Sequence, residues 1–326
     1  MNGAVDSVLG GLPEQVRHRI ARAGLTAEDL QAVLGWPASD GLIFAGSLAD
    51  GTGSRESDLD FVVLHDGEGR FTDQIADRGF EPAEVTRSSF VDRLLTVVGG
   101  IEFDIWVVDR EQASPLRQVL ASSVTPQGEL LSLPGLQYLE MKLLTRLYSA
   151  TVLQSAATVE SWRQALRVSA LPVIRIAGGL VGCISYLEDA WSIGDLAAGD
   201  GRIDGGGPGP ARVADPFGTV IAARSAAEQL VQAALASTGV LTWDLRYARA
   251  HRDRLAACGA ELPMPLRDLE SLLLPAADTD ADGYARQVMS CLASYVAGLT
   301  SPPEQAALNY IRTFAAERFA LDLPFL

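Results

Sequence analysis

The sequence from Phe44 to Leu64, FAGSLADGTGSRESDLDFVVL, combines two apolar runs with a polar, glycine-containing connection. Short runs that are rich in β-branched and aromatic residues and bounded by Gly, Asp or Ser are typical of β-strands. The first run extends back to Gly41, and the second begins at Leu59. A third run of this kind, Ile101–Val108, follows later in the chain. These runs predict strands over 41–45, 59–64 and 101–108, and therefore an α/β front part.

Helical patterns surround these strands. We expect short helices over 14–23 and 27–34, the second capped by Thr26, a polar helical segment around 71–78, and an apolar segment around 90–98. From about Leu136 onward, apolar residues recur at the i, i+3, i+4 spacing of helices. The segments with this pattern are 136–151, 159–184, 216–237, 244–258, 284–299 and 303–319. The predicted fold class is α+β: a small mixed β-sheet with flanking helices over residues 1–135, followed by an α-helical domain over 136–326.

The chain is strongly acidic, and the excess lies in the front part. Its 326 residues include 41 acidic and 26 basic side chains, for a net charge of −15. Residues 1–135 hold 21 acidic and 10 basic side chains, a net charge of −11. Binding to long nucleic acid needs basic surface that displaces counterions, so we expect no long nucleic acid as a partner. The same charge would attract a cationic substrate.

Rare residue types exclude several chemistries. Lys142 is the only lysine in the chain, and because Met141 precedes it the Gly-Lys-Ser/Thr phosphate loop is absent. Three histidines are too few for a His-rich metal site and weaken any Ser-His-Asp scheme. Three scattered cysteines form no disulfide framework.

We expect a cytoplasmic protein without a membrane partner. The longest apolar candidate, residues 170–185, contains Arg175 and several glycine or proline residues, whereas a membrane span needs about 20 predominantly apolar residues. The N-terminal residues lack the basic and apolar regions of a signal peptide.

Three aspartates mark a candidate metal site. Side chains alternate along a strand, so Asp58 and Asp60 should project from one face. Asp104 lies in the middle of the third apolar run, where an unpaired carboxylate is costly. If the second and third strands are neighbours, all three carboxylates converge. Oxygen ligands of this kind suit Mg²⁺, which fills its remaining positions with water and substrate phosphates. A nucleoside triphosphate is the expected source of those phosphates.

In order and spacing, these motifs resemble those of the polymerase-β-like nucleotidyltransferase superfamily. The resemblance rests on Gly46-Ser47, the eleven-residue step from Ser47 to Asp58, the Asp-Leu-Asp motif at the start of a strand, and the later Asp104. It covers about residues 41–108 and is nearest to the small-molecule, aminoglycoside-type members. It implies a magnesium-dependent enzyme that moves a nucleoside monophosphate, most readily AMP from ATP, to a hydroxyl of a small acceptor and releases pyrophosphate.

The resemblance also implies roles for individual residues. Asp58, Asp60 and Asp104 would be the catalytic metal ligands for two Mg²⁺ ions, and Asp104 could also accept the proton of the acceptor. Gly46, Ser47 and Ser57 would contact the nucleotide. The 1–135 domain would then be catalytic, and the helical domain would supply the acceptor-binding side.

Lys142 is a further candidate for binding the triphosphate, with a solvated surface lysine as the alternative. This candidate matters because Asp50 stands where many small superfamily members place a basic residue.

Several alternatives remain open on the sequence. Glu102 could act as an additional base or pair with an arginine, and Trp106 could stack on a ring or pack in the core. The enzyme could instead join nucleotides into signalling molecules or nucleotidylate a protein. A non-enzymatic alternative is an inactive nucleotide-binding module. The acceptor, the preferred base and the oligomeric state stay open.

Overall fold

The computed structural model describes residues 2–54, 56–66, 84–193, 215–241, 272–275 and 279–318. The chain divides into two compact units. The first comprises Met1–Gly128 and Pro134–Leu171, and the second comprises Glu129–Leu133 and Pro172–Leu326. The segments predicted as helices over 71–78 and 244–258 lie outside the described residues.

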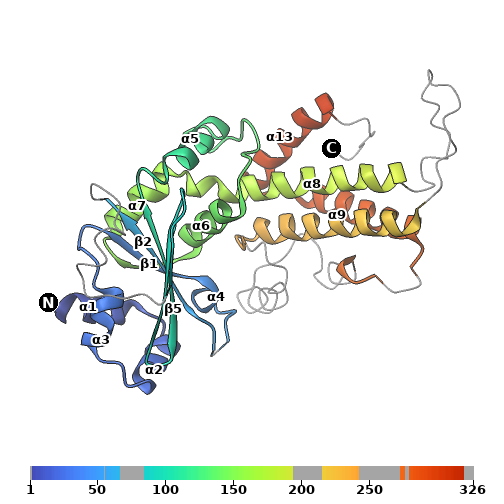
Figure 1. Cartoon of the computed structure of the whole chain (residues 1–326). Coiled ribbons are helices and arrows are strands. Elements are labelled where there is room, and N and C mark those ends of the chain that lie inside the picture. The colour runs from blue at the N-terminus through green and yellow to red at the C-terminus, as the bar shows by residue number, and fades with distance from the viewer. Residues whose placement is uncertain are drawn as a thin grey trace, which may run out of the picture. The chain divides into compact units, whose positions relative to one another are not determined.

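A six-stranded mixed sheet forms the centre of the first unit (Figure 1). Its strands lie in the order β3-β4-β5-β2-β1-β6; β2 and β5 are parallel, and all other neighbours are antiparallel. The strands are β1 (Gly41–Ala45), β2 (Leu59–His65), β3 (Glu84–Thr86), β4 (Asp92–Val98), β5 (Ile101–Asp109) and β6 (Thr151–Gln154). The three predicted strands are confirmed as β1, β2 and β5, and the apolar segment around 90–98 forms β4.

Helices α1 (Asn2–Gly11), α2 (Glu14–Arg22) and α3 (Ala27–Leu34) supply the apolar layer on one face of this sheet. Their buried side chains share a core with Phe44, Phe61 and Phe103, which come from three neighbouring strands. Thr26 caps α3 as predicted, because its hydroxyl accepts from the Asp29 amide at 3.2 Å and Asp29 accepts from the Thr26 amide. Phe61 and Phe103 point to this face. Asp60 and Asp104 alternate with them along β2 and β5, and therefore point to the opposite face.

The boundary between the units differs from the predicted one after residue 135. Helix α6 (Tyr138–Ser149), strand β6, helix α7 (Ala156–Ala165) and the short helix η3 (Val168–Ala170) belong to the unit that holds the sheet. The remaining helices of this unit are α4 (Gly46–Ala49) and α5 (Ser114–Ser123). Strand β6 explains the difference, since its pairing with β1 ties residues that follow α6 to the edge of the sheet.

The second unit is helical in its described residues. It contains α8 (Leu171–Ile193), α9 (Pro216–Ser237), α12 (Ala281–Gly298) and α13 (Pro302–Arg318). The division between the units falls after Leu171, the first residue of α8. Helices α8 and α9 lie close together at Gly179, where a side chain would not fit: a Cβ atom added there would lie 2.7 Å from the Gln229 carbonyl oxygen. The stretch Val168–Ile193 has the length and hydropathy of a membrane span, but 67% of its apolar window is buried, as in a core helix. The predicted α+β fold class, a mixed sheet with flanking helices and a helical C-terminal region, is confirmed.

Candidate functional site

The parallel pairing of β2 and β5 brings the three predicted aspartates together. The register places Asp60 directly beside Asp104, and Asp58 precedes β2 by one residue. Each residue offers one carboxylate oxygen, and these oxygens lie within 4.8 Å of one another. Asp60 and Asp104 are buried, whereas Asp58 is half-buried. The predicted convergence of the three carboxylates is therefore confirmed.

This carboxylate cluster has the properties of a cation site. The pKa of Asp60 is raised to about 7, mainly by burial and also by the nearby charges of Asp58 and Asp104, against the lowering effect of Arg146 and Lys142. A divalent cation would favour the charged form of all three groups, because an opposite charge at short distance offsets both burial and repulsion. Carboxylate oxygens in this number suit Mg²⁺. The donor set thus fits the predicted metal.

Arg146 is a residue of this site that the sequence did not reveal. It lies on α6 with only 4% of its surface exposed, and its Nη2 atom contacts Asp60 Oδ1 and lies 3.5 Å from Asp104 Oδ2. Its guanidinium group also lies 4.2 Å from the centre of the Trp106 ring. Among the described residues, its Nε and Nη1 atoms have no hydrogen-bond partner. A buried guanidinium thus holds two of the three carboxylates and has donors left over.

Lys142 lies at the same place, one helical turn before Arg146. Its Nζ atom is 5.0 Å from the centre of the Trp106 ring. The pKa of Lys142 is lowered, first by burial and then by the positive charge of Arg146. Residues four apart on a helix share one face, and this spacing is the sequence signal that could have identified Arg146. Lys142 is half-buried at the site rather than extended into solvent, while its role in binding phosphate stays a prediction.

Neighbouring strands complete the surroundings. Arg93 on β4 donates through Nε to Asp104 Oδ1 at 2.7 Å, so Asp104 contacts two arginines. Glu102 is exposed and does not belong to the carboxylate cluster. Trp106 is 2% exposed and packs beneath Lys142 and Arg146, so core packing with two cations describes it better than a ring open to a nucleotide.

The predicted nucleotide-binding loop lies directly beside Asp60. Gly46 has φ +75°, and a Cβ atom built on it would lie 2.0 Å from Asp60 Oδ2. The Ser47 carbonyl accepts from the amides of Thr52 and Gly53 at 2.8 Å each. The Ser57 hydroxyl accepts from the Ser54 amide at 2.9 Å. Ser47 and Ser57 therefore order the connection that leads to Asp58, while their contact with a nucleotide stays a prediction.

Replacing Gly46 with alanine should disrupt the metal site. The new methyl group must displace the Asp60 carboxylate, so Mn²⁺ or Mg²⁺ affinity should fall by about 10-fold to 100-fold, as when the support of a ligand is lost. Isothermal titration calorimetry with Mn²⁺ measures this. Gly51→Ala is the matched control, since Gly51 has φ +73° but a Cβ atom added there would meet no other atom within 4 Å. An equal loss of metal affinity in both variants would show that backbone strain, and not the contact with Asp60, causes the loss.

Comparisons with known proteins identify no family for this chain. No family model matches the chain, and no curated protein matches it. The crystal structure of a nucleotidyltransferase-like protein from Exiguobacterium sibiricum 255-15 is similar at 10% sequence identity and a TM-score of 0.39, over 91% of this chain and 80% of that one. This similarity assigns neither a family nor a function to the chain.

Proposed function

We propose that the protein is a magnesium-dependent nucleotidyltransferase that moves a nucleoside monophosphate, most readily AMP from ATP, to a hydroxyl group of a small acceptor. The observation that carries this proposal is the convergence of the Asp58, Asp60 and Asp104 carboxylates within 4.8 Å, beside a loop that begins with a glycine. Two cationic side chains, Lys142 and Arg146, lie at the same cluster and would favour the negatively charged phosphates of a nucleotide.

The three carboxylates would hold the metal ions, for which two Mg²⁺ are proposed. Bound Mg²⁺ would neutralise the triphosphate and lower the pKa of the attacking hydroxyl. Asp104, which contacts Arg93 and Arg146, would accept the proton of that hydroxyl. Arg146, which is 4% exposed, would hold the Asp60 and Asp104 carboxylates in position for the metal ions. Gly46 leaves room for the Asp60 carboxylate close to the backbone.

The acceptor is proposed from charge. Residues 1–135 have a net charge of −11, which favours a small cationic compound over nucleic acid. We also propose that the protein is cytoplasmic and that its helical part binds the acceptor.

A product assay tests the proposed reaction. The purified protein is incubated with Mg²⁺, one of the four nucleoside triphosphates and a cationic, neutral or anionic hydroxyl compound. The released pyrophosphate is measured, and the products are identified by mass spectrometry. We expect pyrophosphate release that depends on Mg²⁺ and is fastest with a cationic acceptor. Products that contain only nucleotides would support a signal synthase, and a modified protein would support a protein-nucleotidylating enzyme. Preference for neutral or anionic acceptors would contradict the charge-based choice.

A second candidate is a nucleotide-binding module that performs no transfer. The pairing of Arg146 with Asp60 and Asp104 favours it, since an arginine in this position neutralises carboxylates without a metal. Equilibrium dialysis separates the two candidates. Binding of ATP that is unchanged when EDTA replaces Mg²⁺ favours the module, whereas binding that requires Mg²⁺ favours the enzyme.

The role of Lys142 can be tested by replacing it with glutamine. If Nζ contacts the triphosphate, loss of one charged hydrogen bond of about 1.5 to 3 kcal/mol should raise KM for the nucleotide by about 10-fold to 100-fold. Steady-state kinetics with varied ATP measures this change. Lys142→Arg serves as the control, because it keeps the charge above Trp106 and should retain most of the affinity. An unchanged KM in Lys142→Gln would return Lys142 to the status of a structural lysine.

A further inference from the structure

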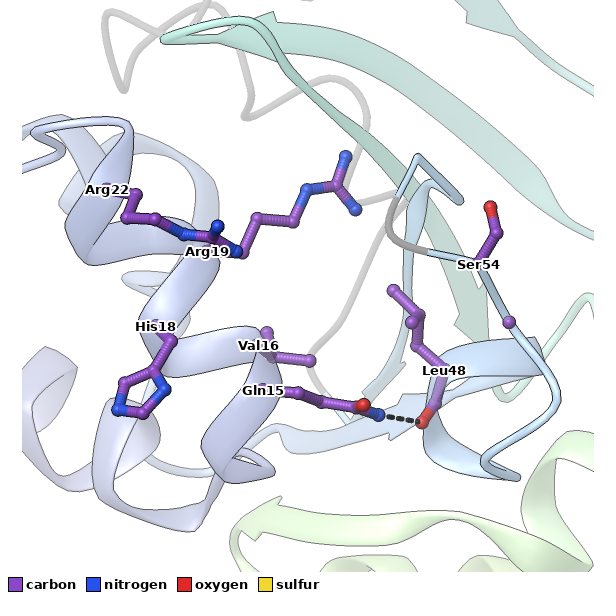
Figure 2. A pocket seen from close by; sticks show the side chains of 8 residues that line it. Gln15, Val16, His18, Arg19, Arg22, Leu48 and Ser54 are labelled. Atoms are coloured by element: carbon purple, nitrogen blue, oxygen red, sulfur yellow. Dashed lines mark hydrogen bonds between the residues drawn. The ribbon is translucent and has the colours of Figure 1, made fainter.

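A cavity lies away from the aspartate cluster, between α2 and the connection that leads from α4 to β2. Its volume is about 280 Å³. Figure 2 shows Gln15 and Arg19 extending from α2 toward the side that carries Leu48 and Ser54. The lining residues are Gln15, Val16, His18, Arg19, Arg22, Leu48, Gly53 and Ser54.

The charge of this cavity is opposite to that of its surroundings. Helix α2 carries Arg17, Arg19 and Arg22 against a single acid, Glu14, whereas residues 1–135 together have a net charge of −11. Arg19 and Arg22 are three residues apart and so project from neighbouring positions on one face of the helix. The described residues that line the cavity include no carboxylate. A basic, carboxylate-free cavity in an acidic region favours an anion.

Hydrogen bonds hold both walls of the cavity in place. Arg19 donates through Nη1 to the Ser57 carbonyl, and the Gln15 side chain donates to the Leu48 carbonyl at 3.4 Å. On the loop, the Ser54 amide is held by the Ser57 hydroxyl at 2.9 Å. An arginine that is already positioned loses less freedom when it binds an anion. These hydrogen bonds thus join α2 to the connection on the other side of the cavity.

The cavity is separate from the aspartate cluster. Val16 and Ile20 of α2 belong to the apolar layer that contains Leu59 and Phe61 of β2, so α2 covers the face opposite to Asp60. None of the three aspartates lines the cavity. An anion bound there would therefore not depend on a metal held by the carboxylates.

We propose that this cavity binds a small anion that contains a diphosphate group. Guanidinium groups form paired hydrogen bonds with phosphate oxygens, and the two arginines offer one guanidinium group to each of two linked phosphates. The cavity volume is at the lower end for ligand pockets, which suits one small molecule. Two sources share this chemistry: free pyrophosphate and the diphosphate of a nucleotide. Arg19 donates to the Ser57 carbonyl, so an anion held by Arg19 would lie beside the connection that leads to Asp58.

Calorimetric titration in EDTA tests the site without any contribution from a bound metal. Pyrophosphate is titrated into wild-type protein and into the Arg19→Gln/Arg22→Gln double variant. We expect saturable binding to the wild type and at least about tenfold weaker binding to the double variant, since each lost charged hydrogen bond contributes about 1.5 kcal/mol or more. Arg17→Gln is the matched control, because Arg17 is an exposed arginine of the same helix that does not line the cavity. Thermal unfolding of each variant shows whether it is folded.

Further arms separate the sources and the sites. ADP binding more tightly than pyrophosphate assigns the cavity to a nucleotide, and the reverse order assigns it to the free anion; adenosine should not bind. Arg22→Gln alone should also weaken binding and does not remove the Arg19 bond to Ser57. Asp58→Asn should leave pyrophosphate affinity in EDTA unchanged. The proposal is overturned if pyrophosphate fails to bind the wild type, if Arg17→Gln weakens binding as much as the double variant, or if only Asp58→Asn alters it.

Discussion

Asp58→Asn should lower the rate of metal-dependent nucleotidyl transfer by about 10²-fold to 10⁴-fold, the range found for single electrostatic and acid–base contributions to catalysis. The asparagine keeps the shape of the side chain but removes one of three charges that converge within 4.8 Å. Loss of that charge weakens the attraction for a divalent cation and leaves Asp60 and Asp104 to hold it.

Asp58 is the most informative of the three aspartates for this test. It is half-buried and has no ion pair within the described part of the chain, whereas Asp60 and Asp104 contact Arg146. The Asp58 variant should therefore fold normally, and relief of its repulsion with Asp60 should if anything stabilise the metal-free protein.

Rates of pyrophosphate release and Mn²⁺ affinity, measured on the same preparations, test this prediction. Glu102→Gln is the control: it also removes one carboxylate, from an exposed position on β5 outside the cluster, and should change the rate little. If Asp58→Asn retained the wild-type turnover and Mn²⁺ affinity, the proposed reaction would be contradicted.

Arg146→Gln should destabilise the metal-free protein by about 3 to 5 kcal/mol, the usual effect of removing one partner of a buried ion pair. The guanidinium is 4% exposed and contacts two buried carboxylates. Without it, Asp60 and Asp104 remain buried side by side, and among the described residues Arg93 and Lys142 are left to offset their charge. Chemical denaturation in EDTA measures the free energy of unfolding.

Added Mn²⁺ or Mg²⁺ should restore much of this lost stability, because a cation bound by the carboxylates replaces the missing positive charge. Arg110→Gln is the matched control: Arg110 also lies over a tryptophan ring and pairs with an aspartate, Asp66, at 2.7 Å. That pair is 47% and 28% exposed, so its loss should cost less than about 1 kcal/mol and should not respond to metal. Equal unfolding free energies for Arg146→Gln and the wild type would contradict the inferred role of Arg146 as counter-ion. A loss of stability that metal does not reverse would argue against a cation site.

Local sequence signals were sufficient for the centre of the sheet and for the acidic residues. Strands β1, β2 and β5 are rich in apolar residues because nearly all of their positions are buried, and such runs are recognisable without knowledge of their partners. Helix α3 was recognisable from its capping residue Thr26. By contrast, β6 is four residues long and lies directly after a helical pattern, and α1 contains three glycines that weaken the helical signal. Both form because they pack against the rest of the unit.

The sequence by itself determined which side chains could supply a metal site, because the alternation of a strand and the cost of a carboxylate in an apolar run are local properties. It identified Asp58, Asp60 and Asp104 and predicted their convergence on the condition that two strands are neighbours. Only the tertiary structure satisfied that condition, through the parallel pairing of β2 with β5. Only the tertiary structure also brought Arg146 from α6 into contact with two of the carboxylates. It likewise brought Arg19 and Arg22 from α2 into one cavity with Ser54. These contacts join residues far apart in the chain, and their charges interact strongly only at the short distances that folding creates.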